Sequence, residues 1–165
     1  MLHSSRENLR PVGISIRKLL TCDLTAISNL HANSFNRGWS TSELKDILKC
    51  TGGISFIASS DYGLVGFIIA QSIDGEAEVI SLAVDIRFRQ FGIATRLLAK
   101  LEKKLRSLNG RSIILEVSKA NVNAIKLYRK NGFRQISVRK SYYTYKSGKS
   151  TDALVYKKIL HSDTR

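Results

Sequence analysis

The chain has 165 residues with 27 Lys+Arg against 13 Asp+Glu, a formal net charge of +14 at pH 7, and 43% hydrophobic residues. This length and composition predict a folded protein with a substantial core, most simply one domain. No apolar run approaches the roughly 20 residues of a membrane helix. Arg17 and Lys18 interrupt the apolar part of the N-terminus, which argues against a signal peptide.

The first predicted elements follow a short N-terminal segment. We expect residues 1–9 to form a flexible tail and residues 10–165 one domain in the cytoplasm. A strand is predicted over "GISIRKLL". A helix follows in "DLTAISNLHANSF", where the apolar positions share one face and Asp23 is the expected N-cap. "STSELKDILKC" begins a second short helix, since Ser40 and Glu43 match the capping box S-x-x-E.

Three strands and a long helix come next. "ISFIASS" and "GLVGFIIAQ" are joined around the turn "SDYG", and "DGE" turns the chain into "AEVISLAVDI". Residues 92–108 are predicted to be a helix that ends at the Asn-Gly pair of residues 109–110. The apolar stripe of this helix is expected to comprise Ala94, Leu97, Leu98, Leu101, Leu105 and Leu108.

The last elements complete an α/β pattern. "RSIILEVS" is a strand whose continuous apolar run indicates burial on both faces. "NVNAIKLYRK" is a short helix, and "FRQISVRKSYYTY" and "DALVYKKIL" are strands around a turn with Gly148. The predicted order is β-α-α-β-β-β-α-β-α-β-β, a mixed sheet of about seven strands flanked by about four helices.

The stretch "RQFGIATRLL" is a candidate anion site. It lies between a strand and a helix, where the first N–H groups of the helix have no partners within the helix. Gly92 and Ala94 allow close approach to those amides, and Arg89 adds a cation. The alternative is that Gly92 only starts the helix.

Two further side chains are candidates for chemistry. Glu116 lies near the C-terminal end of an apolar strand, where burial favours a general base, although an ion pair with a lysine explains it equally well. Asn121 is a sensible helix N-cap, and Tyr128 shares its helix face. Tyr128 is an ordinary core residue unless it meets Glu116.

Metal ligands and charge are less specific. The two cysteines, Cys22 and Cys50, and three scattered histidines lack the clustering of a metal site, so no metal is expected. The excess of cations has two explanations: a weak electrostatic contact with RNA, or a lysine-rich composition without a specific partner.

Residues 89–94, "RQFGIA", satisfy every fixed position of Q/R-x-x-G-x-G/A, the pyrophosphate loop of the GNAT acetyltransferase superfamily. The downstream "LEVSKANVNAIKLYRKNGF" resembles the second hallmark of that family, L-E-V-x-x-x-N-x-x-A-I-x-L-Y-x-x-x-G-F. The chain is similar to GNAT acetyltransferases over residues 12–160. The resemblance implies the GNAT fold and acetyl-CoA as co-substrate.

Within that superfamily, the chain resembles the bacterial ribosomal-protein N-terminal alanine acetyltransferases (RimI-like enzymes). "SFNRGWS" is similar to their F-P-W-S helix junction, with two extra residues and no proline. "KSYYTYKSGKSTDALVY" is similar to their C-terminal segment, with Thr144 where a proline often follows the tyrosines. The implied reaction is direct transfer of acetyl to the N-terminal alanine of a small-subunit ribosomal protein.

The resemblance also implies a role for each matching residue. Glu116 is the general base, and Tyr128 is the general acid that protonates the leaving thiolate. Trp39, Tyr142 and Tyr143 bind the acceptor. The residues implied in cofactor binding are Tyr128, Leu82, Ala83, Val84, Arg89, Gln90, Phe91, Gly92, Ile93, Ala94, Thr95 and Asn121.

Other amines remain open as acceptors, namely protein lysines, polyamines or the aminoacyl group of charged tRNA. A nucleic-acid-binding module that keeps the fold is the alternative outside enzymes. That alternative has no use for Glu116 and Tyr128 at the family spacing.

Overall fold

The computed structural model describes residues 13–144 and 150–160. They form one seven-stranded sheet in the order β1-β2-β3-β4-β5-β7-β6, in which only β4 and β5 pair in parallel. The strands are β1 Ser15–Lys18, β2 Gly53–Ser60, β3 Gly63–Ile73, β4 Glu76–Val84, β5 Ser112–Ser118, β6 Arg134–Thr144 and β7 Ser150–Ile159.

Within the described residues, four α-helices flank the sheet: α1 Leu24–Ser34, α2 Thr41–Lys49, α3 Ile93–Arg106 and α4 Val122–Lys130. Two short 3-10 helices, η1 Thr21–Asp23 and η2 Ile86–Phe88, precede α1 and follow β4. The predicted fold class and element order are therefore confirmed. The expected tail of residues 1–9 and the turn with Gly148 lie outside the described residues, and the division into a tail and one domain stays a prediction.

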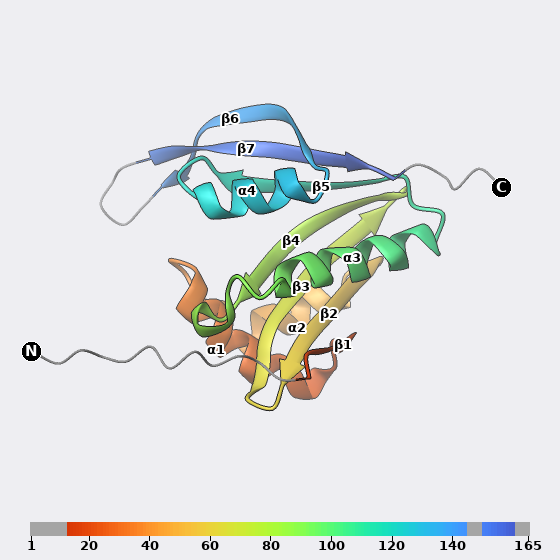
Figure 1. The fold of residues 1–165 in the computed structure, drawn as a ribbon, viewed down its shortest axis with the longest axis vertical. Helices are drawn as coiled ribbons and strands as arrows, with labels where there is room; N and C mark the ends of the chain where they lie inside the picture. The colour runs from red at the N-terminus through yellow and green to blue at the C-terminus, as the bar shows by residue number, and fades with distance from the viewer. Residues whose placement is uncertain (1–12, 145–149, 161–165) are drawn as a thin grey trace, which may run out of the picture.

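Each face of the sheet has its own hydrophobic core. The larger core joins the leucines of α3 and Tyr128 of α4 to one face. The smaller core joins α1 and α2 to the other face, around Phe67 and Ile69 of β3. Figure 1 shows α3 crossing β2–β4 and α4 lying over β5 and β7. The sheet is thus covered on both sides near β3, as an α/β fold requires.

Local signals account for most element boundaries. Ser40 Oγ accepts a hydrogen bond from the Glu43 N–H, and the Glu43 carboxylate accepts one from the Ser40 N–H, which confirms the capping box. The Asp-Gly pair after β3 has φ values of 49° and 80°, the left-handed pair that a tight hairpin needs. After α3, the Gly110 N–H donates to the Leu105 carbonyl at 2.9 Å and stops the helix as predicted.

Three expectations were wrong in detail. Asp23 occupies the predicted N-cap position of α1, but its side chain makes no capping hydrogen bond, because the carboxylate instead accepts hydrogen bonds from Arg17 and the Leu20 N–H in the preceding turn. Leu108 lies beyond the end of α3 and is 52% exposed, so it does not extend the apolar stripe. Strand β5 alternates buried and half-buried residues because, among the described helices, α4 covers one face of this strand and none covers the other.

Candidate active site

Strands β4 and β5 separate part-way along their length. Residues 76–79 pair with residues 112–115, and the two strands then diverge toward their C-terminal ends (Figure 1). Backbone N–H and C=O groups of residues 80–84 that point toward β5 therefore lie outside the sheet ladder. An extended ligand that enters between the strands can hydrogen-bond to this edge.

A β-bulge marks the point of separation. Ile69 pairs with Ser81 and Ala70 with Val79, so Ile80 is an extra residue in β4. A bulge twists its strand and turns backbone groups out of the ladder. In β4 it places such groups where the pairing with β5 ends.

The loop between β4 and α3 has the geometry of an anion site. Gln90 and Gly92 both have positive φ, 70° and 76°. Left-handed residues in a turn gather successive N–H groups into a concavity that suits anions. Gly92 holds the N-cap position of α3 without a side-chain cap, so the first N–H groups of the helix remain available for a ligand. Arg89 is exposed, and its Nε donates to the Val84 carbonyl at 3.1 Å.

The surroundings of this loop fit a pyrophosphate group. A Cβ on Gly92 would meet no atom within 4 Å, so the space beside its backbone is open and only the positive φ demands glycine. No acidic residue lies in the first turn of α3. The side chains of Ala83, Val84 and Ile93 are buried in the two cores, so these residues can reach a ligand only through their backbones. Leu82, Ala94 and Thr95 are half-buried, and Phe91 is 43% exposed.

Glu116 lies on β5 one residue past the last pair with β4. Its neighbours Leu115 and Val117 belong to the core beneath α3, so the Glu116 side chain points to the opposite face. That side chain is 17% exposed, and Oε1 is 3.1 Å from Nε of Arg139. The ion-pair alternative is thus correct about a cation, although the partner is an arginine and not a lysine.

Tyr128 is buried on α4, on the same face as α3. Its ring packs edge-on against Phe133, with 5.8 Å between centroids, and lies 6.4 Å from the ring of Tyr156. Burial, with a smaller effect from Tyr143, raises the pKa of the Tyr128 phenol to about 12. Tyr128 and Glu116 therefore belong to opposite faces of the sheet.

Asn121 is the N-cap of α4, as its sequence position predicts. Its Oδ1 accepts a hydrogen bond from the Ala124 N–H at 3.1 Å. The far end of α4 is tied to α3, since Asn131 Nδ2 donates to Thr95 Oγ1 at 3.2 Å. The anion loop and α4 are thereby held in fixed relation.

The three residues expected to bind the acceptor lie in two places. Trp39 sits between α1 and α2, where its ring stacks on His31. Tyr142 and Tyr143 are adjacent near the end of β6, with ring centroids 5.2 Å apart at 89°. Tyr142 is 50% exposed and lies near Arg139. Tyr143 makes the smaller contribution to the raised pKa of Tyr128. The structure thus joins Glu116 with Arg139 and, through it, with Tyr142, and places Trp39 in a separate cluster with α1.

A family model described as the acetyltransferase (GNAT) family matches residues 24–133. The chain belongs to the GNAT acetyltransferase family. It is therefore an N-acetyltransferase that moves an acetyl group from acetyl-CoA to an amine. The matched residues include the anion loop, Glu116 and Tyr128.

Named relatives agree with this assignment. A [ribosomal protein bS18]-alanine N-acetyltransferase of Haemophilus ducreyi is 37% identical over 92 residues, 56% of this chain and 63% of that protein. An uncharacterized N-acetyltransferase of Methanocaldococcus jannaschii is 32% identical over 129 residues, 78% of this chain and 83% of that protein. The crystal structure of the ribosomal-protein-S18-alanine N-acetyltransferase from Escherichia coli has the same fold, with a TM-score of 0.83 at 24% identity over 93% of this chain and 99% of that one.

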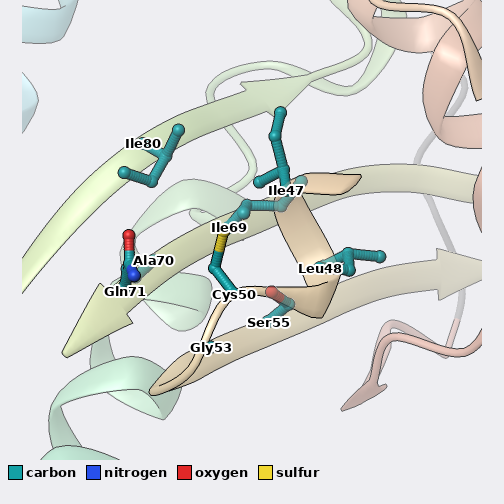
Figure 2. A pocket seen from close by; sticks show the side chains of 9 residues that line it. All are labelled: Ile47, Leu48, Cys50, Gly53, Ser55, Ile69, Ala70, Gln71 and Ile80. Carbon is teal, nitrogen blue, oxygen red and sulfur yellow. The ribbon is translucent and has the colours of Figure 1, made fainter. Parts of the chain in front are cut away.

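A small pocket of this GNAT domain borders the bulge. It measures about 130 Å³ and lies between the end of α2 and strands β2–β4 (Figure 2). Its wall is mostly apolar and includes Ile47, Ile69 and the bulge residue Ile80. Ser55 Oγ is buried beside it and has no hydrogen-bond partner among the described residues.

Sequence reasoning missed Arg139, His31 and the bulge at Ile80. The first two act through partners on other elements, and the third depends on the register of β3 against β4, so no local pattern reveals them. Across the part of the chain that the structure describes, no helix has both the length and the apolar character needed to cross a bilayer. Residues 13–144 and 150–160 also hold no cluster of three His, Cys, Asp or Glu side chains suited to a metal ion.

Proposed function

We propose that this enzyme acetylates the N-terminal α-amine of a protein, and that its acceptor is the N-terminal alanine of a small-subunit ribosomal protein. The observation that carries the proposal is the position of Glu116, a carboxylate at the point where β4 and β5 separate and the bulge turns backbone groups outward. The names of the Haemophilus and Escherichia relatives supply the acceptor.

Acetyl-CoA supplies the acetyl group and a thiolate leaving group. In this proposal the amides of Arg89, Gln90, Gly92 and neighbouring loop residues hold its pyrophosphate, since both left-handed residues and the uncapped start of α3 lie there. The free edge of β4 at residues 82–84 pairs with the pantetheine arm. Asn121 contacts the same arm from the start of α4.

Glu116 acts as the base. Only the neutral amine has a lone pair with which to attack the thioester, and Glu116 accepts, directly or through a water, the proton that the nitrogen loses as it becomes an amide. The amine nitrogen bonds to the acetyl carbon while the carbon–sulfur bond breaks. Cys22 and Cys50 are exposed and lie on η1 and after α2, so direct transfer to the amine needs neither thiol.

Tyr128 acts as the acid. Because burial holds its pKa at about 12, the phenol is protonated throughout the neutral range. It donates its proton toward the thiolate as the carbon–sulfur bond breaks, and the proton taken up by Glu116 then restores the phenol through solvent. In this proposal the two proton transfers occur on opposite sides of the reacting carbon, and the positions of Glu116 and Tyr128 on opposite faces of the sheet support this arrangement.

The acceptor peptide binds on the face that carries Glu116. Trp39 and the Tyr142–Tyr143 pair flank that face from the α1–α2 connection and from β6. An α-amine with a pKa near about 8 needs less help from a base than lysine at about 10.4, which suits a single carboxylate. Exposed cations on α4 and β6 favour a weak contact with RNA, and the cytoplasm is the expected compartment. They are Lys126, Arg129, Lys130, Arg134 and Lys140.

A peptide assay tests this function. The protein is incubated with acetyl-CoA and one of two peptides, both of which carry internal lysines. The first peptide begins with a free Ala-Arg, and the second is the same peptide with a blocked N-terminus. Mass spectrometry should locate the acetyl group on the alanine nitrogen of the first peptide and leave the second unmodified. Preferential acetylation of the internal lysines would overturn the proposal.

A further inference from the structure

Arg139 reaches the proposed base from two strands away. The strand order is β5-β7-β6, and Glu116 pairs with Val155 of β7 while Arg139 pairs with Ala153. The Arg139 side chain therefore crosses β7 to place its Nε 3.1 Å from Glu116 Oε1. Ala153 and Val155 on this path have short, buried side chains, which leave room for the arginine stem.

The backbone of β6 is irregular immediately after Arg139. Its register against β7 shifts between Arg139 and Tyr143, and Ser141 has a φ of 53°. A non-glycine residue in this conformation is uncommon and needs support from its surroundings. Here the Ser141 N–H donates to Asp152 Oδ1 at 3.0 Å.

This irregularity gives Arg139 a second partner. The Tyr142 ring lies beside the guanidinium, with 5.4 Å between Cζ of Arg139 and the ring centroid. A cation at this distance is attracted to the ring face. Arg139 is thus fixed between the proposed base and a residue proposed to bind the acceptor, although its own side chain is 57% exposed.

We propose that Arg139 is a positioning and specificity residue that orients the Glu116 carboxylate and repels acceptors that arrive as ammonium ions. The inference rests on the proposed role of Glu116 as the base. An isolated carboxylate would attract an ammonium group and hold it in its unreactive form. The positive charge of the guanidinium beside the carboxylate opposes that binding.

The consequence is a preference for α-amines over lysine side chains. At neutral pH the neutral fraction of an α-amine with a pKa near 8 exceeds that of lysine, near 10.4, by about 250-fold. A site that repels the protonated form therefore admits α-amines far more often. Arg139 would in this way contribute to selection of the N-terminus.

Two unreactive peptides measure the repulsion directly. One carries an N-terminal trimethylammonioacetyl group, and the other carries the neutral group of the same shape, 3,3-dimethylbutanoyl. Their inhibition constants against the acceptor peptide are compared in wild type, Arg139→Gln and Arg139→Lys. Lys140→Gln is the matched control, since it removes one cation from the next residue of β6.

The ratio of the two inhibition constants should shift about tenfold toward the cationic peptide in Arg139→Gln, which corresponds to loss of one like charge at about 6 Å in a partly screened site. Arg139→Lys and Lys140→Gln should keep the wild-type ratio within about twofold. An unchanged ratio in Arg139→Gln, or the same shift in Lys140→Gln, would overturn the inference. If Arg139 had only a structural role, Arg139→Gln would weaken the binding of both peptides equally.

Catalysis provides the second measurement. Arg139→Gln should lower kcat for the α-amine peptide through misorientation of Glu116 and should reduce the α-amine to lysine ratio of kcat/KM several-fold. Arg139→Lys should restore most of that ratio. If wild type itself prefers lysine peptides, the proposed function fails, whereas the Arg139 inference is decided separately by the unreactive pair.

Discussion

The imidazole of His31 and the indole of Trp39 are stacked, with ring centroids 4.1 Å apart and planes inclined by 18°. The Trp39 backbone N–H donates to His31 Nδ1 at 3.2 Å, and Ser28 Oγ donates to the Trp39 carbonyl at 2.7 Å. Helix α1 thus holds the connection to α2 through His31 Nδ1, which must carry no proton in order to accept this hydrogen bond. Since Trp39 is the single tryptophan of the chain, its fluorescence reports on this contact.

The first prediction concerns acid stability at His31. Burial lowers the pKa of His31 below its ordinary value of 6.5, and the negative charge of Glu43 opposes this in part. The unfolded chain takes up a proton below pH 6.5 while folded His31 stays neutral, so the contribution is present above pH 6.5 and lost as pH falls. Thermal unfolding at a series of pH values should show Tm falling below this pH, accompanied by a change in Trp39 emission.

The control variant is His31→Gln, whose amide oxygen accepts the Trp39 N–H but does not titrate. It should lose the part of the Tm decline that begins near pH 6.5 and keep any decline at lower pH. A pH profile identical to wild type would show that His31 is not responsible.

Residues that interact with near neighbours in the chain were predictable from the sequence. The Ser40–Glu43 capping box and the Gly92 turn each depend on positions a few residues apart, and both occur as predicted. Asp23 stands at the predicted N-cap position, but its carboxylate makes no capping hydrogen bond because its strongest partner, Arg17, lies on β1. The bidentate ion pair of Asp23 with Arg17 is stronger than a helix-capping hydrogen bond.

The Glu116–Arg139 contact was not predictable, because β7, which follows both residues in the sequence, lies between their strands. The register of three paired strands determines the distance between Glu116 and Arg139, and the hydrophobic alternation within each strand gives no information on that register. Glu116 and Tyr128 were candidates from their positions in the sequence, and the family resemblance gave each its implied role. Their division between two faces of the sheet came from the packing of Leu115 and Val117 under α3.

The second prediction concerns Asp23. Its side chain is 10% exposed and accepts two hydrogen bonds of 2.7 Å from Arg17, which, with the Leu20 N–H, hold its pKa below 3.8. Asp23→Asn should lower the free energy of unfolding by about 1–3 kcal/mol in denaturant titrations at pH 7. The loss should shrink as pH falls through the lowered pKa, where protonation removes the wild-type advantage. Asp46→Asn, in an exposed pair with Lys49, should cost under about 0.5 kcal/mol.

The third prediction concerns the base. Glu116→Gln keeps the shape of the side chain but does not accept a proton from the amine, so kcat at neutral pH should fall by about 100-fold or more. Affinity for acetyl-CoA, measured by calorimetry, should stay unchanged because the anion loop is untouched. Glu78→Gln, on the exposed part of β4, is the control and should keep wild-type kcat. Equal rates in both variants would remove Glu116 from the mechanism.

The fourth prediction concerns the acid. Tyr128→Phe removes one hydroxyl from a packed core position and should lower kcat about 10- to 100-fold while the fold is kept. Ultraviolet titration should show one phenol that ionises only near pH 12 in wild type and is missing in the variant. Tyr156→Phe, which removes a buried hydroxyl bonded to Arg129, should leave kcat unchanged. A comparable loss in Tyr156→Phe would mean that core packing causes both effects.

The fifth prediction separates backbone strain from ligand binding at two glycines. Gly92 and Gly63 have φ of 76° and 88°, and a Cβ on either one would meet no atom within 4 Å. Alanine at each position should therefore cost a similar stability, about 1 kcal/mol, through the left-handed conformation alone. Gly63 lies at the β2–β3 hairpin, whereas Gly92 precedes the N–H groups proposed to hold pyrophosphate. Calorimetric titration with coenzyme A should show binding weakened at least tenfold in Gly92→Ala and unchanged in Gly63→Ala. Equal affinities in the two variants would place the pyrophosphate elsewhere.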